Sequence, residues 1–409
     1  MNIQILKSEV ANRQSSITIT GSKSESNRLL LLQALYPELS IENLSNSDDS
    51  VLMQKALRSD APTVDIHHAG TAMRFLTAYF ASRENREVLL TGSSRMKERP
   101  IGILVDALRT LGAEISYQEN EGFPPLKIVG KNIDNSQVTL KANVSSQYIS
   151  ALLLIASQLG HGLELTLDGK ITSVPYIKMT LSLLEEIGVN TNFEGQVIKV
   201  LPLKEKPLVS SLTVESDWSS ASYFYSITAL SEEGTEITLS AYKKNSLQGD
   251  SVLVDVYKAF GVETTFDKHS ITLKKSNVLN SEAIMNLDLA NAPDIAQTIA
   301  VTAFGLGLEC YMVGLHTLKI KETDRLVALK IELEKLGANV NITENSLHLS
   351  KSDKINQGVA IDTYKDHRMA MAFAPLGLKT NININDADVV SKSYPDFWKD
   401  LKAIGFQLK

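Results

Sequence analysis

The stretch ELEKLGANVNI, residues 332–342, introduces a pattern that recurs along this 409-residue chain. An amphipathic helix ends at a glycine, and the residues after the glycine alternate as they do in a strand. Glycine at that place is typical of a left-handed helix C-cap. Similar stretches end at Gly112, Gly188, Gly261 and Gly405, and a degenerate copy begins at Met53. Self-similarity of this kind predicts a fold built from repeated helix and strand units.

A second, more uniformly apolar helix is predicted ahead of each of these copies. Helices that are apolar on all sides are buried, whereas the glycine-ending helices carry a polar face and should lie outside. We therefore predict six units with a break near residue 210, which gives two α/β domains in which strands cover bundled inner helices. The expected inner helices are at 26–35, 70–81, 145–156, 219–230, 293–304 and 367–378.

Composition indicates a soluble globular protein, with 43% hydrophobic and 22% charged residues. The net charge of -6 argues against a nucleic-acid partner. No signal peptide is recognised and no apolar run approaches the roughly 18 residues that span a membrane, so we expect a cytoplasmic protein without a membrane partner. The single cysteine, Cys310, lies in an apolar stretch and is expected to be a buried, inert thiol in a reducing compartment.

The polar start of the first inner helix, GSKSESNRLLLLQAL at 21–35, has two interpretations. Serine and asparagine could cap the helix by accepting hydrogen bonds from its first N–H groups. Alternatively, Lys23, Arg28 and the positive end of the helix dipole could form an anion site. This stretch alone favours capping, and it lacks the second glycine of a P-loop.

Polar residues gather at many other helix starts, and a repeat fold should point these starts the same way within each domain. One helix terminus contributes only about 0.3 to 1 kcal/mol toward binding an anion. Charge-assisted hydrogen bonds contribute about 1.5 to 3 kcal/mol each, so the basic residues would decide affinity. We therefore expect at least two small anionic ligands, including phosphate, and no metal or other cofactor. The residues at these starts are Lys23, Ser24, Arg28, Gly70, Thr71, Arg74, Arg95, Lys97, Arg99, Ser145, Ser146, Gln147, Ser173, Tyr176, Asp217, Asp294, Lys321, Glu322, Arg325, Asp366, His367, Arg368 and Lys392.

Asp294 and Glu322 are candidates for general acid and base catalysis, because both lie beside the basic motifs. Each could instead be an ordinary acid in the first turn of a helix. His367 could orient Asp366 or a substrate, and a purely structural histidine is an equal alternative.

Together the motifs resemble the 5-enolpyruvylshikimate-3-phosphate synthase family over the whole chain. The resemblance is carried by GSKSESNR (21–28), AGTAMR (69–74), RMKERPIG (95–102), SSQY (145–148), PYIKMTL (175–181), SSASYF (219–224), QGDS (248–251), PD (293–294), KIKETDRL (319–326), YKDHRMAM (364–371) and SKSYPDFW (391–398). It implies a two-domain inverse α/β-barrel-like fold of six βαβαββ-like repeats. Residues 21–215 would form one domain, residues 1–20 with 216–409 the other, and the active site would lie in the cleft between them.

The resemblance also implies an activity, the transfer of the enolpyruvyl group of phosphoenolpyruvate to the 5-hydroxyl of shikimate 3-phosphate with release of phosphate. This reaction belongs to chorismate and aromatic amino-acid biosynthesis. We assign Asp294 to the hydroxyl proton, Glu322 to the methylene proton and Lys23 to the leaving phosphate, although one carboxyl could serve both steps. We expect a monomer whose partners are these two small molecules.

Binding roles follow from the same resemblance, position by position. Those implied for phosphoenolpyruvate are Lys23, Gly70, Arg95, Gln147, Arg325, Arg368 and Lys392. Those implied for shikimate 3-phosphate are Lys23, Ser24, Arg28, Ser145, Ser146, Gln147, Ser173, Tyr176, Asp294, Thr317 and Lys321.

The chain departs from the family pattern at several places, which bear on substrate affinity and glyphosate sensitivity more than on the reaction. They are Thr317, His68, Val174, Trp218, Phe75 and a shortened segment at 57–65. Two alternatives are weighed. A carboxyvinyltransferase acting on UDP-N-acetylglucosamine normally has Lys-Asn at the first helix and a reactive loop cysteine, unlike Lys23-Ser24 and Cys310. A noncatalytic phosphate-ligand-binding relative would be expected to lose Asp294 or Glu322.

Overall fold

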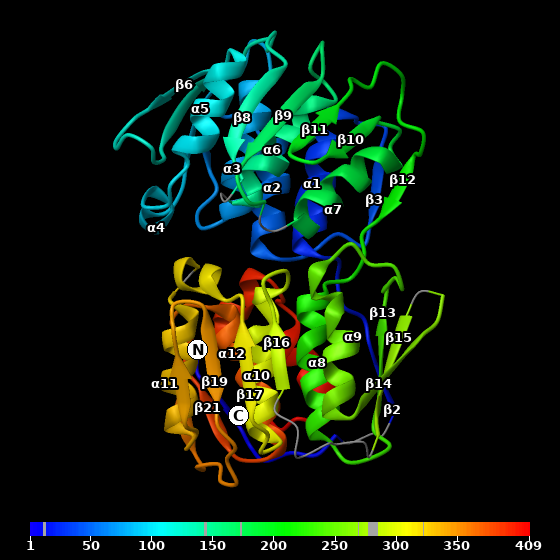
Figure 1. Ribbon diagram of the computed structural model, residues 1–409, viewed down its shortest axis with the longest axis vertical. Coiled ribbons are helices and arrows are strands. Elements are labelled where there is room, and N and C mark those ends of the chain that lie inside the picture. The colour runs from blue at the N-terminus through cyan, green and yellow to red at the C-terminus, as the bar shows by residue number, and fades with distance from the viewer. Residues whose placement is uncertain (11–13, 143–144, 172–173, 269, 277–284, 322) are drawn as a thin grey trace. The chain divides into compact units, whose positions relative to one another are not determined.

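The computed structural model describes residues 1–10, 14–142, 145–171, 174–268, 270–276, 285–321 and 323–409. The chain divides into two compact units, one of Gly21–Val214 and the other of Met1–Thr20 with Glu215–Lys409. We call them the 21–214 unit and the C-terminal unit (Figure 1). Their boundary falls one residue before the boundary that we expected from the sequence.

Glu215 belongs to the C-terminal unit because its buried carboxylate is bonded there. It accepts hydrogen bonds from the indole Nε1 of Trp218 at 2.8 Å, from the backbone N–H of Lys243 at 3.0 Å and from the hydroxyl of Ser246 at 2.7 Å. Burial raises the pKa of Glu215 above its ordinary value. A buried carboxylate needs such donors, so they hold Glu215 with residues 216–409.

Three inner helices pack against one another in the 21–214 unit, as the apolar stretches predict. Their cores are buried, while the helices around them bury only one face. The inner helices are α1 (Lys23–Leu35), α3 (Gly70–Ala81) and α6 (Ser146–Ala156). The others are α2 (Asp48–Leu57), α4 (Ser94–Lys97), α5 (Gly102–Leu111) and α7 (Val174–Glu186).

Sheets cover these helices, and two of them share one pattern, a parallel pair followed by two antiparallel neighbours. One has the order β4 (Thr63–Asp65), β5 (Glu87–Thr91), β7 (Leu126–Val129), β6 (Glu114–Tyr117). The other has β8 (Gln137–Lys141), β9 (Leu163–Asp168), β11 (Val197–Val200), β10 (Thr191–Glu194). A parallel pair joins β3 (Ser40–Glu42) to β12 (Ser211–Thr213).

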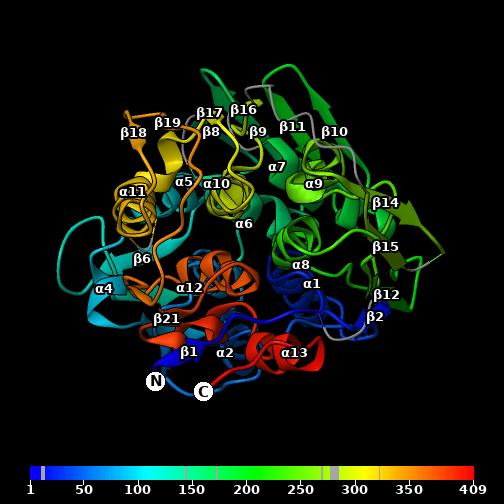
Figure 2. The same cartoon turned by 90° about the horizontal axis from the view of Figure 1, so that it is seen from below.

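The C-terminal unit repeats this arrangement, with α10 packed against both α8 and α12 (Figure 2). Its inner helices are α8 (Trp218–Leu230), α10 (Ala296–Gly305), which follows the 3-10 turn η3 (Pro293–Ile295), and α12 (His367–Phe373), which continues as η5 (Ala374–Leu378). The remaining helical elements are η1 (Gly249–Val252), α9 (Leu253–Val256), η2 (Tyr257–Phe260), η4 (His316–Ile320), α11 (Arg325–Lys335), η6 (Ala387–Lys392) and α13 (Phe397–Ala403).

The N-terminal strands complete sheets of the C-terminal unit. β2 (Gln14–Ile17) is parallel to β13 (Glu236–Ser240), followed by β15 (Ser270–Lys275) and β14 (Val262–Phe266). β1 (Ile3–Ile5) pairs with β21 (Ile382–Ile384), which is parallel to β20 (Val359–Ile361). The third sheet has the order β16 (Met285–Asp288), β17 (Cys310–Val313), β19 (Ser346–Leu349), β18 (Val340–Ile342).

Glycines in left-handed conformations follow the outer helices, as predicted. Gly112, Gly188, Gly337 and Gly405 have φ between 96° and 115°, and Gly261 has φ 74°. The stretch before Gly261 departs from the expectation, because its last turn, η2, is a 3-10 helix. The number of repeats stays a prediction.

Two further expectations concern the single cysteine and membrane-spanning helices. Cys310 is fully buried, as predicted, and burial raises the pKa of its thiol to about 12, so it is not a reactive thiolate. None of the helices within the described residues has the length and apolar character needed to cross a membrane.

Candidate active site

The start of α1 does not use the predicted serine cap. Among the described residues, the Ser22 side chain makes no capping hydrogen bond to the helix, and Ala69 before α3 cannot make one. By contrast, the Ser145 hydroxyl accepts a hydrogen bond from the backbone N–H of Gln147 at 3.3 Å. The capping interpretation is therefore wrong for the Ser22 side chain, and the anion-site interpretation of this stretch stays a prediction.

Arg28 is buried and bonded to other parts of the 21–214 unit. Its Nε donates to the hydroxyl of Thr180 at 2.8 Å, its Nη1 to the carbonyl of Ser24 at 2.7 Å and its Nη2 to the hydroxyl of Ser150 at 2.9 Å. Burial lowers the pKa of Arg28 to about 10, so it stays charged near neutral pH. Arg28 therefore ties α1 to α6 and α7 and fixes the backbone of Ser24.

Two aromatic rings flank the Arg28 guanidinium. Its Cζ lies 5.5 Å from the ring centroid of Phe75 and 5.9 Å from that of Tyr176, within the range of cation–π attraction. Phe75 is one of the departures from the family pattern. It connects α3, which begins at Gly70, to this buried arginine.

The basic side chain at the start of α3 is Arg99. The sequence placed Arg99 among the cations at helix starts, but the phosphoenolpyruvate role there was given to Arg95. A Cβ placed on Gly70 would lie 2.9 Å from the Arg99 Cζ, so glycine leaves room for the guanidinium. Arg95, which we predicted there, is exposed and pairs with Glu98 at 2.7 Å. The signal for Arg99 is the proline after it: the restricted backbone at Pro100 ends the short helix that carries Arg95.

Two side chains hold the segment that carries Arg99. The Pro100 carbonyl accepts a hydrogen bond from Arg74 Nη2 at 2.8 Å and another from the Tyr148 hydroxyl at 2.7 Å. Burial and then the positive charge of Arg99 lower the pKa of Arg74 to about 10. Because Arg74 lies on α3 and Tyr148 on α6, both helices fix this loop.

The starts of α3 and α6 are adjacent, because Gln147 Nε2 donates to the hydroxyl of Thr71 at 3.2 Å. Lys23 lies half-buried at the start of α1, and Ser146 opens α6. The 21–214 unit thus brings predicted residues of α3 and α6 together.

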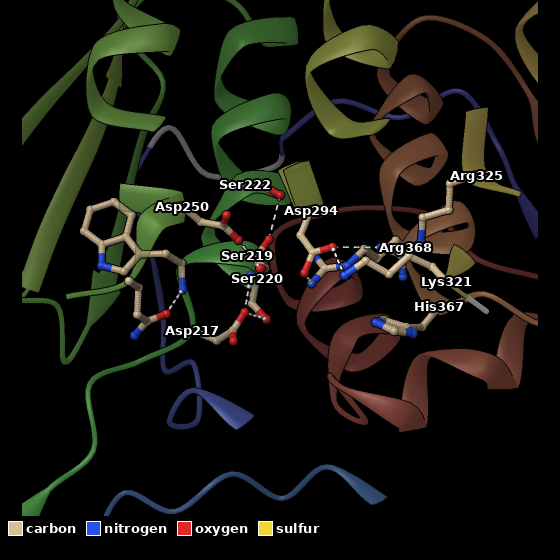
Figure 3. A network of polar contacts seen from close by, with 12 residues as sticks. Asp217, Ser219, Ser220, Ser222, Asp250, Asp294, Lys321, Arg325, His367 and Arg368 are labelled. Carbon is tan, nitrogen blue, oxygen red and sulfur yellow. Dashed lines mark hydrogen bonds and ion pairs between the residues drawn. The ribbon is translucent and has the colours of Figure 1, made fainter. Parts of the chain in front are cut away.

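Asp294 is the centre of a second cluster, in the C-terminal unit (Figure 3). Its Oδ1 lies 2.9 Å from Arg325 Nη1 and 3.5 Å from Lys321 Nζ, and its Oδ2 lies 3.1 Å from Arg368 Nη2. The carboxylate comes from η3, and the three cations come from the end of η4, the start of α11 and the start of α12. The structure therefore brings together four residues that the sequence selected from three separate motifs.

Asp366 holds the other side of Arg325. Its Oδ2 accepts from Arg325 Nε at 2.6 Å, and its Oδ1 accepts from the backbone N–H of Arg368 at 2.9 Å. Neither Arg325 nor Asp366 is more than 2% exposed. The buried His367 lies beside them, with Nδ1 3.9 Å from Asp366 Oδ1. In this set, the carboxylates of Asp294 and Asp366 face the cations of Lys321, Arg325 and Arg368.

A third carboxyl, Asp250 of η1, was not selected by our sequence analysis. It accepts a hydrogen bond from the hydroxyl of Ser219 at the start of α8 (Figure 3). Burial, and then the negative charge of Asp294, raise the pKa of Asp250 to about 7. Burial lowers the pKa of Arg368, but Asp294, Tyr223 and Asp250 more than offset this and raise it. Arg368 therefore remains a cation at physiological pH.

The remaining predicted residues have the following places. Lys392 ends η6, and its Nζ donates to the carbonyl of Lys365 at 2.7 Å. Thr317 lies in η4. Glu322 and Ser173 lie outside the described residues, so their roles stay predictions. Within the described ranges, no group of three or more His, Cys, Asp or Glu residues could hold a metal ion.

Two other departures from the family pattern have defined partners. His68, ahead of α3, lies with Nε2 3.8 Å from Asp48 Oδ2 at the start of α2. Trp218 is fully buried and donates to Glu215 through its indole nitrogen. Trp218 is thus hydrogen-bonded within its own unit, whereas the contact of His68 is longer than a hydrogen bond.

Fold and clusters define a class of protein: an α/β protein of two compact units whose helix starts carry cations suited to small anions. The family model of EPSP synthase (3-phosphoshikimate 1-carboxyvinyltransferase) matches residues 59–401. The chain belongs to the EPSP synthase family, which confirms the resemblance seen in the sequence, and it is an enzyme.

Relatives match over the full length. A 3-phosphoshikimate 1-carboxyvinyltransferase of Bacteroides fragilis is 45% identical over 412 residues, which cover 100% of this chain and 99% of the relative. One from Photobacterium damsela subsp. piscicida is 36% identical, covering 95% of this chain and 96% of the relative. The structure of EPSP synthase from Acinetobacter baumannii superposes with a TM-score of 0.82 at 21% identity, covering 100% of this chain and 99% of that chain. This likeness confirms the predicted fold class.

Proposed function

We propose that the chain transfers the carboxyvinyl group of phosphoenolpyruvate to the 5-hydroxyl of shikimate 3-phosphate and releases inorganic phosphate. This reaction is a step toward chorismate in aromatic amino-acid biosynthesis. The observation that carries the proposal is the Asp294 carboxylate held by Lys321, Arg325 and Arg368, because it combines a proton acceptor with cations for anionic substrates. The family and its full-length relatives support the substrate pair.

In the C-terminal unit, Arg325, Arg368 and Lys392 bind phosphoenolpyruvate. Arginine presents a planar fork that matches carboxylate and phosphate oxygens, and a charge-assisted bond is worth about 1.5 to 3 kcal/mol. Lys321 and Thr317 contribute to the binding of shikimate 3-phosphate. Both arginines are already oriented by carboxylates, so little side-chain entropy is lost when an anion binds.

Asp294 accepts the proton of the 5-hydroxyl as the new C–O bond forms. A general base must reach the proton that it removes, and the three cations fix this carboxylate in one orientation. Glu322 supplies the proton to the methylene carbon. Lys23 stabilises the phosphate as it leaves the tetrahedral adduct, while the new methyl group loses a proton and the C=C bond re-forms.

In the 21–214 unit, Ser145, Ser146 and Ser173 hold the phosphate of shikimate 3-phosphate, with Tyr176 beside them. Ser24 and Arg28 meet its carboxylate. Arg28 donates to the hydroxyls of Thr180 and Ser150 and to two backbone carbonyls, which occupies most of its N–H groups and supports a mainly positioning role. Gln147 and Lys23 touch both substrates.

Phosphoenolpyruvate also binds at the start of α3, and we propose that Arg99, in place of Arg95, binds it there. Support comes from the approach of Arg99 to Gly70, where no side chain blocks the helix start, and from the pairing of Arg95 with Glu98. We infer that residues of both clusters take part in the same reaction. The monomeric state and the cytoplasmic location stay predictions.

The activity is tested by identifying the product. Purified protein is incubated with phosphoenolpyruvate and shikimate 3-phosphate without added metal, and the enolpyruvyl ether is sought by mass spectrometry. The same incubation with UDP-N-acetylglucosamine tests the alternative transferase. The proposal is supported if the enolpyruvyl ether forms with shikimate 3-phosphate as the acceptor and does not form with UDP-N-acetylglucosamine. An ether on the sugar nucleotide, or no product with either acceptor, contradicts it.

A further inference from the structure

The turn ahead of α12 has an unusual backbone. Tyr364 and Lys365 both have positive φ values, 54° and 57°, and they are the only consecutive non-glycine pair of this kind among the described residues. Left-handed conformations are unfavourable for such side chains and persist where surrounding contacts impose them. We therefore expect the contacts that hold this turn to position nearby functional residues.

All three predicted phosphoenolpyruvate cations of the C-terminal unit depend on this turn. The carbonyl of Lys365 accepts the hydrogen bond from Lys392. The next residue, Asp366, binds the Arg325 guanidinium and the backbone N–H of Arg368. A shift of the turn would therefore move the partners of all three cations at once.

Glu332 of α11 holds the turn at residues 362–366 through hydrogen bonds. It is fully buried, and its Oε1 accepts a hydrogen bond from the Tyr364 hydroxyl at 2.6 Å. Its Oε2 accepts from the backbone N–H of Asp362 at 3.2 Å and pairs with Lys335 Nζ at 2.8 Å. Burial, and then Glu332, raise the pKa of Tyr364, so its phenol keeps the donated proton.

The anchor and one of the cations share a helix. α11 begins at Arg325, and Glu332 follows seven residues later, about two turns along the same rigid rod. The helix therefore holds the Arg325 guanidinium at one point and the turn at another. This fixes the distance between Arg325 and the residues that follow Tyr364.

We propose that Glu332 and Tyr364 are positioning residues, which hold the 362–366 turn so that Arg325, Arg368 and Lys392 converge on one phosphoenolpyruvate anion. The inference rests on the proposed function for the identity of that anion. Neither residue touches substrate; both act through the turn. Loss of the Tyr364 hydroxyl should therefore weaken phosphoenolpyruvate binding more than shikimate 3-phosphate binding.

The test is Tyr364→Phe, which removes one hydroxyl and keeps the ring. The matched control is Tyr225→Phe, which removes a buried hydroxyl bonded to Thr264 at 2.9 Å in the same unit. KM for each substrate, kcat and Tm are measured for both variants and the parent. We expect the KM for phosphoenolpyruvate to rise about tenfold in Tyr364→Phe, with the KM for shikimate 3-phosphate within about twofold of the parent. The control should keep both KM values.

A binding readout separates failure of this inference from failure of the proposed function. Inorganic phosphate should raise the Tm of the parent and of Tyr225→Phe, and raise that of Tyr364→Phe much less, whether or not the parent turns over. Glu332→Gln keeps one acceptor oxygen but places an amide NH2 against the Asp362 N–H and the Lys335 ammonium. It should therefore also raise the KM for phosphoenolpyruvate more than that for shikimate 3-phosphate. The inference is overturned if Tyr364→Phe keeps the parental KM for phosphoenolpyruvate and the parental response to phosphate. It is also overturned if Tyr364→Phe or Glu332→Gln raises the KM values for both substrates equally.

Discussion

The Arg325 guanidinium lies against both carboxylate oxygens of Asp366, with Nε 2.6 Å from Oδ2 and Nη2 3.4 Å from Oδ1. This pair is buried, and the remaining Nη1 reaches Asp294. One arginine thus joins the helix start of α11 to the turn ahead of α12 and to the proposed base. Its loss would leave a buried carboxylate without its cation.

Replacing Arg325 should therefore destabilise the fold as well as the site. Breaking a buried ion pair by removing one partner costs about 3 to 5 kcal/mol of the free energy of unfolding. We expect a loss of that size for Arg325→Met, measured by urea unfolding. The control is Arg95→Met, which removes an exposed pair with Glu98 and should cost less than about 1 kcal/mol. Equal effects of the two substitutions would contradict the role given to the buried pair.

The two arginines of the 95–102 segment should differ in function. Arg99→Gln should raise the KM for phosphoenolpyruvate at least about tenfold, since it removes a charge-assisted hydrogen bond. Arg95→Gln should leave that KM within about twofold. Gly70→Ala should also raise it, because the added Cβ would lie 2.9 Å from the Arg99 Cζ. Steady-state kinetics at saturating shikimate 3-phosphate measures all three, and a larger effect of Arg95→Gln would restore the original prediction.

Asp294 should matter more for turnover than for binding. A general base contributes roughly 10²- to 10⁴-fold, so we expect kcat of Asp294→Asn to fall by at least about 100-fold. The amide keeps the shape of the side chain, and the KM values should change far less. Asp255→Asn is the control, because Asp255 is exposed and pairs with the exposed Lys258. If kcat stays within tenfold of the parent, Asp294 is a structural partner of the cations instead.

Asp250 should give the fold a pH dependence. Its pKa is raised from 3.8 to about 7, so between these values the folded state binds more protons than the unfolded state. The free energy of unfolding should therefore fall as the pH rises from about 4 to about 7, by up to a few kcal/mol from this group.

Asp250→Asn removes that contribution. The variant should lose less stability than the parent between pH 5 and pH 8, measured by urea unfolding at both values. Asp255→Asn again serves as the control and should follow the parent. An unchanged difference between the two pH values in Asp250→Asn would refute the titration of Asp250.

Much of the fold could be predicted from residues with a local physical meaning. Gly112 and Gly337 could be placed after helices because glycine adopts the left-handed cap without strain, and both do so. The uniformly apolar stretches identified the buried helices, since burial on all sides removes the polar face. The 3-10 turn before Gly261 was not predictable, because its sequence resembles that of the other copies.

The site was harder to predict, because side-chain contacts decide it. Ser22 is a residue type that often caps helices, yet its side chain makes no capping hydrogen bond among the described residues. Arg95 and Arg99 lie in one short motif, and the proline after Arg99 is a weak signal. Their contacts distinguish them, because Arg95 pairs with Glu98 while Arg99 approaches Gly70. Tyr364 carries no sign of a left-handed backbone, since a contact with Glu332, distant in sequence, holds it there.

The central claim is tested most directly by phosphate release from phosphoenolpyruvate. With purified protein and no added metal, we predict stoichiometric release when shikimate 3-phosphate is present and none when it is omitted or replaced by UDP-N-acetylglucosamine. Release that is equal with both acceptors, or absent with shikimate 3-phosphate, would contradict the account.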